Sequence, residues 1–325
     1  MITLQTIKKA RETISKWIKR TPLIYSQFLS DFCGTETQVY LKLENLQLTN
    51  SFKIRGALNR MAQLSQEERR QGVITASSGN HGQAVALAAE QLQLAAKIIV
   101  PTNVSKVKLD KIKKFNVELI QYGNYDDVEP KAIELATKEG LTYVSPYNDE
   151  VIIAGQGTLG LEILEDLDNV DMIIASIGGG GLIAGIALAV KSINPNIQVI
   201  GVQSKAAPTM YESQKAGKIV MTKEGNSIAN GLMGGLEKGA ITFELIQKHV
   251  NKLFLVKEET IKNAIYLLWE KENQIVEGAG AITVAHILEQ KERFRGKTVV
   301  AVISGGNIEE TLFQEILREV GEWKT

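Results

Sequence analysis

The sequence has little of what disulfide-linked, metal-binding or nucleic-acid-binding proteins need. Cys33 is the only cysteine among 325 residues, so no internal disulfide can form and a reducing compartment is expected. The three histidines, His81, His249 and His286, are scattered and match no metal-ligand spacing, so we expect no metal site. Lys+Arg and Asp+Glu both total 37, which gives a net charge of +0 and predicts no nucleic-acid partner.

Long apolar runs are also lacking. The runs present are interrupted well short of a membrane span, so no membrane partner is expected. The first twenty residues have neither the continuous apolar core nor the cleavage site of a signal peptide. They are instead amphipathic, because apolar side chains recur at helical spacing. These are Ile7, Ala10, Ile14, Trp17 and Ile18. The sequence therefore predicts a cytoplasmic protein.

Short apolar runs alternate with helical patterns along almost the whole chain. Such alternation is typical of βαβ units and parallel sheets. The candidate strands are residues 39–43, 72–77, 96–100, 117–122, 171–177, 198–203, 252–256 and 298–304. One group of strands lies within 72–145 and a second begins at 171, with a long helical stretch at 151–167 between them. We expect a two-lobed α/β protein, with mostly parallel twisted sheets, helices on both faces and a site in the cleft between the lobes.

Four consecutive glycines follow one of these strands, in "SIGGGGLIAGIALAV" (176–190). Bare backbone amides at a helix N-terminus make an anion site, and glycine lets a phosphate approach the chain closely. A tight turn without a ligand is the alternative, but four glycines exceed what a turn requires. A dinucleotide site is disfavoured, because Gln203 ends the next strand where an acidic residue is needed.

Two further turns join a strand to a helix. In "TASSGNHGQAVALAAE" (75–90) hydroxyls, an amide and exposed N–H groups gather at a helix start, an inventory that suits a carboxylate. Serine and asparagine are also common helix caps, and His81 could be a buried structural histidine. In "AVISGGNIEE" (301–310) Ser304 directly follows a strand, although this sequence is also common in turns without function.

Lys53 stands between Phe52 and Ile54, just before a helix-like run. Most lysines are solvated surface charges. Apolar neighbours can instead keep an amine neutral and nucleophilic, because desolvation lowers the pKa of a lysine. Together with the three glycine turns, this lysine suggests a phosphate-bearing cofactor held by a Schiff base.

Six motifs, in order along nearly the whole chain, make the sequence resemble the fold-type II, tryptophan-synthase-β-like pyridoxal-phosphate enzymes. They are "SFKIRGA", "SSGNHGQA", "AGQGT", "GGGGLIAG", "EGAGA" and "SGGN". Within that family the chain is most similar to the group of threonine/serine dehydratases and serine racemases. The resemblance implies a large pyridoxal-phosphate-binding domain of residues 1–71 and 146–325. It also implies a small, mobile, substrate-side domain of residues 72–145.

The resemblance also implies roles for individual residues. Lys53 would form the Schiff base with pyridoxal 5'-phosphate, with Phe52 packed against the ring. Asn80 would bind the ring hydroxyl and Ser304 the ring nitrogen. The residues implied for the phosphate are Gly178, Gly179, Gly180, Gly181 and Leu182. Those implied for the substrate carboxylate are Ser77, Ser78, Gly79, Asn80 and His81. Ser78 would also be the catalytic acid/base on the face opposite Lys53 in a racemase.

A threonine/serine dehydratase (ammonia-lyase) is the function that this resemblance favours. It would convert L-threonine to 2-oxobutanoate and L-serine to pyruvate, releasing ammonia, and would form a homodimer or homotetramer. An amino-acid racemase, a 3-hydroxyaspartate dehydratase and a non-catalytic phosphate-binding protein are the alternatives. Because Gln203 replaces the glutamate metal ligand of animal serine racemases, dependence on a divalent metal is not expected.

Two other departures from the pattern affect local charge and regulation. Asn230 replaces an acidic residue of many relatives. The chain ends shortly after its last strand and helix, so we expect no regulatory domain of the kind found in biosynthetic threonine dehydratases.

Overall fold

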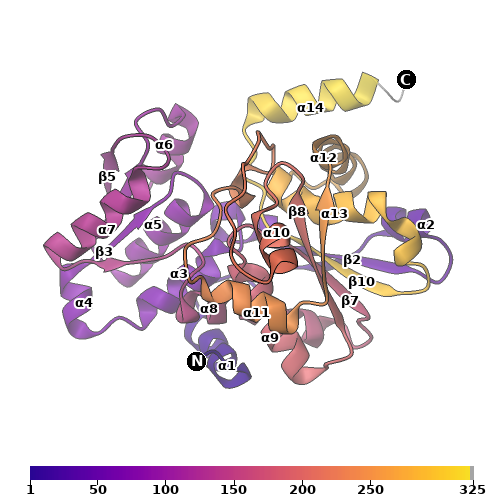
Figure 1. Cartoon of the computed structure of the whole chain (residues 1–325), viewed down its shortest axis with the longest axis horizontal. Coiled ribbons are helices and arrows are strands. Elements are labelled where there is room, and N and C mark those ends of the chain that lie inside the picture. Colours follow the sequence, from indigo (N-terminus) through magenta and orange to yellow (C-terminus); the bar gives the residue numbers. More distant parts are fainter. Residues whose placement is uncertain (323–325) are drawn as a thin grey trace.

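Two separate β-sheets form the framework of the protein (Figure 1). Within residues 1–322, which the computed structural model describes, the larger sheet has six strands in the order β1-β2-β10-β7-β8-β9. The smaller sheet, over the same described residues, has four strands in the order β5-β4-β3-β6. Neighbouring strands are parallel except for β1 and β2, which are antiparallel.

The strands of the larger sheet come from both ends of the chain: β1 (Leu23–Tyr25), β2 (Gln38–Leu43), β7 (Met172–Ser176), β8 (Gln198–Ser204), β9 (Lys252–Val256) and β10 (Thr298–Ile303). The strands of the smaller sheet are consecutive: β3 (Val73–Ala76), β4 (Ala96–Val100), β5 (Glu118–Gln121) and β6 (Thr142–Tyr143). All eight strands expected from the sequence are therefore present. The sequence patterns missed β1 and β6, which are too short to show a period.

The helices alternate with these strands. Those between β3 and β6 are α5 (Asn80–Leu92), α6 (Lys106–Ile112) and α7 (Val128–Glu139). Those before β3 are α1 (Leu4–Ile14), α2 (Gln27–Cys33), α3 (Lys53–Ala62) and α4 (Gln66–Gln71). Those after β6 are α8 (Glu150–Asp166), α9 (Gly181–Ile193), α10 (Thr209–Ala216), α11 (Ile241–His249), α12 (Glu258–Glu272), α13 (Gly278–Glu289) and α14 (Glu310–Glu322). The N-terminal helix ends at Ile14, so Trp17 and Ile18 lie beyond the amphipathic helix in which their spacing had placed them.

Both faces of the smaller sheet are buried. Successive side chains of a strand point to opposite sides, so neighbouring residues pack on the two different faces. Val73 and Ile98 belong to the apolar cluster that contains residues of α5. Their neighbours Ile74 and Ile99 belong to another cluster, which contains residues of α7. The smaller sheet is thus covered by helices on both faces, as the sequence predicted.

The larger sheet is layered in the same way. Ile174 and Val299 pack in a cluster with α12, α13 and α14. Ile173 and Val300 pack on the other side, in a cluster with α9 and α11. This confirms the predicted α/β architecture of mostly parallel sheets flanked by helices. The domain boundaries at residues 72 and 145, and movement of the smaller part, stay predictions.

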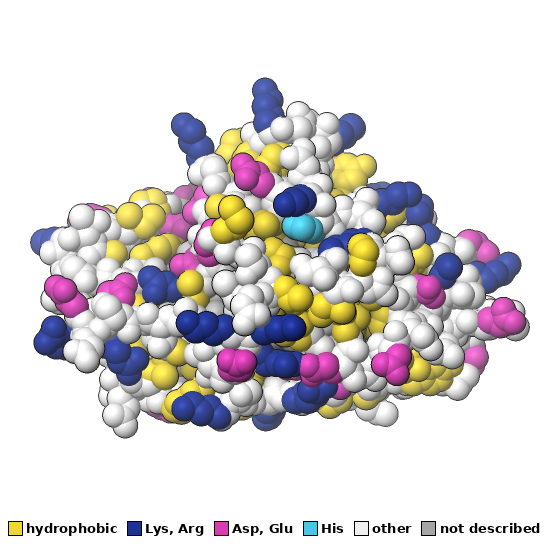
Figure 2. Space-filling view, turned by 90° about the horizontal axis from the view of Figure 1, so that it is seen from below, with side chains coloured by type: hydrophobic (Ala, Val, Ile, Leu, Met, Phe, Trp, Pro, Cys, Tyr) yellow, Lys and Arg dark blue, Asp and Glu magenta, His cyan; other side chains and the backbone are white. Residues whose placement is uncertain are grey.

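The surface carries charges of both signs. On the face shown in Figure 2, Lys and Arg side chains are interspersed with Asp and Glu around apolar areas, and no broad basic surface is visible. Among residues 1–322, no helix combines the length and the apolar composition that crossing a bilayer requires.

Candidate active site

Lys53 is the first residue of α3, two residues after Ser51, which forms an isolated β-bridge with Gly305 just beyond β10. The amide of Phe52 donates to the carbonyl of Ser304 at 3.1 Å. The Lys53 amine donates to the carbonyl of Pro146 at 2.8 Å and lies 5.3 Å from the centre of the Phe52 ring. Burial lowers the pKa of Lys53 from 10.5 to about 8, and the nearby Glu277 carboxyl opposes this effect. The amine is therefore closer to its neutral, nucleophilic form than an exposed lysine.

The four-glycine turn ends at the N-terminus of α9. Within the described chain, the amides of residues 178–182 donate no hydrogen bond to a protein group, and no side chain caps the helix. Gly180 has a φ of 92°, which L side chains rarely adopt. A Cβ at Gly179 would lie 2.3 Å from a ring carbon of Tyr147, so a larger residue does not fit there. A row of free amides at a helix start is an anion site.

A second helix N-terminus lies at the end of β3. The amides of residues 80–82, at the start of α5, also donate no hydrogen bond within residues 1–322. The hydroxyl of Ser77 accepts from the amide of Gly79 at 3.2 Å and so shapes the turn. A Cβ at Gly79 would meet no atom within 4 Å. The turn is open on this side, and its free amides are suited to a carboxylate.

The side chain of His81 points away from this open turn. It is 3% exposed, and its Nε2 lies 2.9 Å from the carbonyl of Val144, so Nε2 is the protonated ring nitrogen. Burial and, to a smaller extent, the charge of Lys53 lower the pKa of His81 to about 3 against the opposing hydrogen bond to Val144, so the ring is neutral. Of the groups of His81, the backbone amide is therefore the one available to a substrate carboxylate.

Ser304 lies just beyond β10, beside the end of β7. Its hydroxyl donates to the carbonyl of Ala279 at 3.0 Å and lies 3.3 Å from the hydroxyl of Ser176. Ser176 ends β7, two residues before the first residue of the four-glycine turn. Parallel pairing of β10 with β7 thus brings the turn at 301–310 next to the four-glycine turn.

Glu277 is a site residue to which sequence reasoning gave no role, although "EGAGA" was among the motifs. Its Oε1 accepts a hydrogen bond from Asn80 Nδ2 at 2.6 Å. Burial raises the pKa of Glu277, and Asn80 is the first of several groups that oppose this. Asn80 in turn accepts from Asn307, which accepts from Lys111 at 3.0 Å. These side chains form a polar chain between α5, α6 and the segment after β10.

Asn80 and Glu277 line a cavity of about 150 Å³. Its walls come from α5 and α6 on one side and from residues 228–231, 277–278 and 307–312 on the other. The cavity thus lies where the helices of the smaller sheet meet those of the larger one. The structure places all the predicted site residues at the carboxyl ends of β3, β7 and β10 or at the start of α3.

Comparison with known proteins identifies the family. A family profile described as "Pyridoxal-phosphate dependent enzyme" matches residues 14–305. The chain belongs to this family. The resemblance expected from the ordered motifs is confirmed, and pyridoxal phosphate is the cofactor of this pyridoxal-phosphate-dependent enzyme.

Curated relatives and solved structures add detail. L-threonine ammonia-lyase of Thermotoga maritima is 43% identical over 320 residues, covering 98% of this chain and 79% of that protein. A catabolic L-threonine dehydratase of Staphylococcus aureus is 43% identical over 315 residues, covering 96% of this chain and 90% of that protein.

Two solved structures share the fold closely. Threonine deaminase isoform 2 of Solanum lycopersicum, in its processed form, has a TM-score of 0.93 and 34% identity. That match covers 98% of this chain and 88% of that one. Serine racemase of Dictyostelium discoideum has a TM-score of 0.88 and 36% identity, covering 95% of this chain and 99% of that one.

The groups of this pyridoxal-phosphate-dependent enzyme fit its cofactor. The free amides of residues 178–182 are suited to a phosphate, and the Lys53 amine to an aldehyde. The segment of Pro146 and Tyr147 links them, because Pro146 accepts from Lys53 and Tyr147 packs against Gly179. The role of each individual residue stays a prediction.

Proposed function

We propose that the protein is a pyridoxal-phosphate-dependent ammonia-lyase. It converts L-threonine to 2-oxobutanoate and ammonia, and L-serine to pyruvate and ammonia. The observation that carries the proposal is the partly desolvated amine of Lys53 near two helix N-termini with free amides. The two relatives at 43% identity, both named for threonine, support this reaction over others of the family.

In this proposal residues of both parts hold the cofactor. The amides of residues 178–182 bind its phosphate, Ser304 its ring nitrogen and Asn80 its ring hydroxyl, with Phe52 beside the ring. Bound pyridoxal phosphate supplies the electron sink that makes a proton on the substrate Cα removable.

Lys53 is the base of the proposed reaction. Its amine takes the proton from Cα, which requires the neutral form that burial favours. The free amides of residues 80–82, with Ser77 and Ser78, hold the substrate carboxylate and so fix which bond at Cα faces Lys53. Loss of water from Cα and Cβ, followed by its addition at the carbon that bears nitrogen, gives the 2-oxo acid and ammonia.

A hydroxyl, in place of a carboxylate, at the ring nitrogen bears on the reaction type. The hydroxyl of Ser304 donates to Ala279 and cannot enforce full protonation of a ring nitrogen as a carboxylate would. Less of the negative charge that forms on the substrate Cα is then delocalised into the ring. This favours prompt loss of a β-hydroxyl over transamination.

An amino-acid racemase is the second candidate. The Ser78 side chain is half-buried, and within residues 1–322 its hydroxyl makes no hydrogen bond to a protein group. It is therefore free to return a proton to Cα from the face opposite Lys53. The similarity to a solved serine racemase supports keeping this candidate.

One substrate panel tests these candidates together. L-threonine, L-serine and 3-hydroxyaspartate are incubated with the holoenzyme, and both 2-oxo acid and the configuration of the remaining amino acid are measured. We expect 2-oxobutanoate from threonine at the highest rate. A dominant D-serine product with little 2-oxo acid would overturn the lyase proposal. In the Ser78→Ala variant, KM should rise because one carboxylate contact is lost, and deamination should persist while any racemisation is lost.

We also propose that the enzyme acts in the cytoplasm as a homodimer or homotetramer, and that residues 72–145 close over bound substrate as a unit. The buried free thiol of Cys33 is compatible with a reducing compartment. Light scattering measures the oligomeric state, and cell fractionation measures the location of the protein. Hydrogen exchange with and without a substrate analogue measures whether residues 72–145 close.

A further inference from the structure

Arg55 lies two residues after Lys53, on the same first turn of α3. Its side chain is 0% exposed, so water cannot solvate its charge. The sequence offers no sign of this burial. Arginines are almost never fully buried unless they are paired. The partners of Arg55 therefore decide where this turn of the helix can lie.

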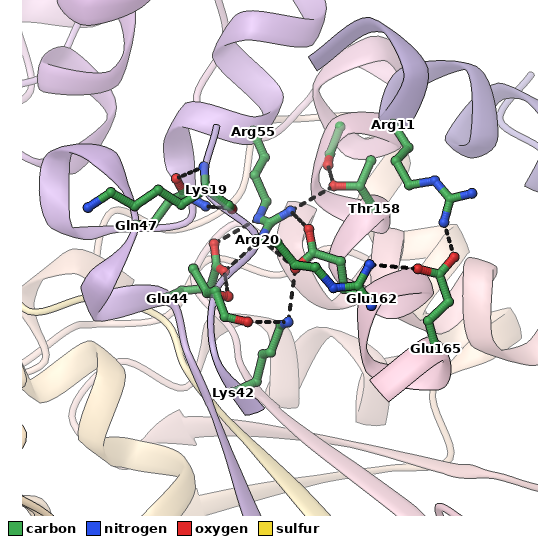
Figure 3. A network of polar contacts seen from close by, with 12 residues as sticks. Arg11, Lys19, Arg20, Lys42, Glu44, Gln47, Arg55, Thr158, Glu162 and Glu165 are labelled. Carbon is green, nitrogen blue, oxygen red and sulfur yellow. Dashed lines mark hydrogen bonds and ion pairs between the residues drawn. The ribbon is translucent and has the colours of Figure 1, made fainter. Parts of the chain in front are cut away.

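Arg55 binds two buried carboxylates at once (Figure 3). Its Nε and Nη2 donate to the two oxygens of Glu44, both at 2.8 Å. Its Nη1 and Nη2 donate to the two oxygens of Glu162, at 2.6 Å and 3.0 Å. Nη1 also donates to the hydroxyl of Thr158 at 3.2 Å. Such two-point pairing fixes the plane of the guanidinium group as well as its position.

Lys42 balances the charge of this group of side chains. Its amine is 0% exposed and lies 2.9 Å from Glu162 Oε2. Two cations and two buried carboxylates thus meet, with the partly exposed Asp166 also 3.3 Å from the Lys42 amine. Thr21 donates a further hydrogen bond to Glu44. Burial acts to raise the pKa of Glu162, but Arg55 and Lys42 outweigh it, and the pKa is lowered. We call Lys42, Glu44, Arg55 and Glu162 the Arg55 cluster.

The Arg55 cluster ties α3 to two other elements. Glu44 begins the short helix η1 (Glu44–Leu46) after β2, and Glu162 lies in α8. Helix α8 packs against α3 so tightly that a Cβ on Gly155 would lie 2.7 Å from the Cα of Gly56.

On its other side α8 packs equally closely against α9. A Cβ on Gly185 would lie 2.6 Å from the amide nitrogen of Gly157. Helix α8 therefore stands between the helix that begins with Lys53 and the helix that begins with the phosphate turn. A shift of α3 relative to α8 would change the distance between these two groups.

We propose that Arg55 is a positioning residue, which holds the first turn of α3 so that the Lys53 amine faces the cofactor bound at the start of α9. The proposal rests on the proposed function for its catalytic readout. Fixed orientation, more than stability, is the reason for the cluster. Buried ion pairs are often no more stabilising than apolar side chains of the same volume. A displacement of about 1 Å at a reacting group can lower a rate by about 100-fold.

Two variants and one matched control test the proposal in the holoenzyme. The double variant Arg55→Met with Glu44→Gln removes one charge of each sign, so Glu162 keeps Lys42 and no unpaired charge is buried. Arg55→Lys keeps the charge but cannot bind both carboxylates at two points. The control, Lys42→Met, removes a buried cation from the same cluster but not from α3. For each variant we measure kcat and KM for L-threonine and the thermal midpoint of unfolding. We also measure the amount of pyridoxal phosphate that borohydride reduces onto Lys53.

We expect both Arg55 variants to lose about 100-fold in kcat with little change in KM, and to carry less reducible cofactor on Lys53. The control should lose thermal stability but keep its cofactor attachment. Equal losses in Arg55 and Lys42 variants of equal thermal midpoint would overturn the proposal, as would full kcat in Arg55→Lys. If wild type binds the cofactor on Lys53 but does not deaminate threonine, the proposed function fails, and cofactor attachment still tests Arg55.

Discussion

Replacing Lys53 with methionine should make the cofactor-free protein more stable at neutral pH. Methionine has a similar length but no charge to desolvate. Burial lowers the pKa of Lys53 from 10.5 to about 8. Each pKa unit corresponds to about 1.4 kcal/mol, so the ammonium form destabilises the folded state by about 3 kcal/mol. The Lys53→Met variant should gain about that much below pH 8.

The sign of the pH dependence follows from proton counts. Between pH 8 and 10.5 the folded protein has released the proton of Lys53, but the unfolded chain still binds it. The free energy of unfolding of wild type therefore rises with pH over this range, relative to the variant. The advantage of Lys53→Met should be complete below pH 8 and shrink to nothing near pH 10.5.

Urea unfolding of the cofactor-free wild type and variant, at intervals from pH 7 to 10.5, measures this difference. Other titrating groups cancel, because they are common to both proteins. Replacing the exposed Lys223 with methionine in the same way gives the baseline. A difference between wild type and Lys53→Met that stays constant over the whole range would refute the reasoning. Lys53 would then titrate as a solvated surface lysine, and burial could not be what makes it nucleophilic.

Three other substitutions test the remaining parts of the site. Gly179→Ala places a methyl group 2.3 Å from the Tyr147 ring, and an absorbance titration should show much weaker pyridoxal-phosphate binding, with about 1–3 kcal/mol lost in urea unfolding. Asn80→Ala leaves the buried Glu277 without its 2.6 Å donor and should cost about 1–3 kcal/mol in the same assay, whereas unchanged stability would contradict that contact. Ser304→Asp should raise the share of transamination over elimination in product analysis, and an unchanged partition would show that the hydroxyl does not control the reaction type.

The sequence specified much of the site because its signals are local. The alternation of apolar runs placed the eight longer strands, since a pleated strand shows its buried faces as runs of apolar residues. The glycine turns at 178–181 and 305–306 marked strand ends by backbone chemistry alone. Lys53 was singled out by its immediate neighbours, and the order of six motifs named the family.

Other parts of the site could not be read from local patterns. Glu277 meets Asn80 across 197 positions of sequence, and its carboxylate looks like any other in a turn. The side chain of His81 turns towards Val144 because of helix packing, which no spacing of residues reveals. "AGQGT" was a family motif without a physical account, and the structure shows Gly155 and Gly157 as points of helix contact.

By itself, then, the sequence determined which groups this enzyme has: one sheltered amine, three glycine turns, and strands that end at them. Only the tertiary structure decided which of these groups meet and which buried charges hold them there. Arg55 lies 11 residues from Glu44 but 107 from Glu162. The reason is physical: the direction of a side chain and the partner of a buried charge depend on the packing of distant elements. Local propensity acts on the backbone within a few residues and carries no information about that packing.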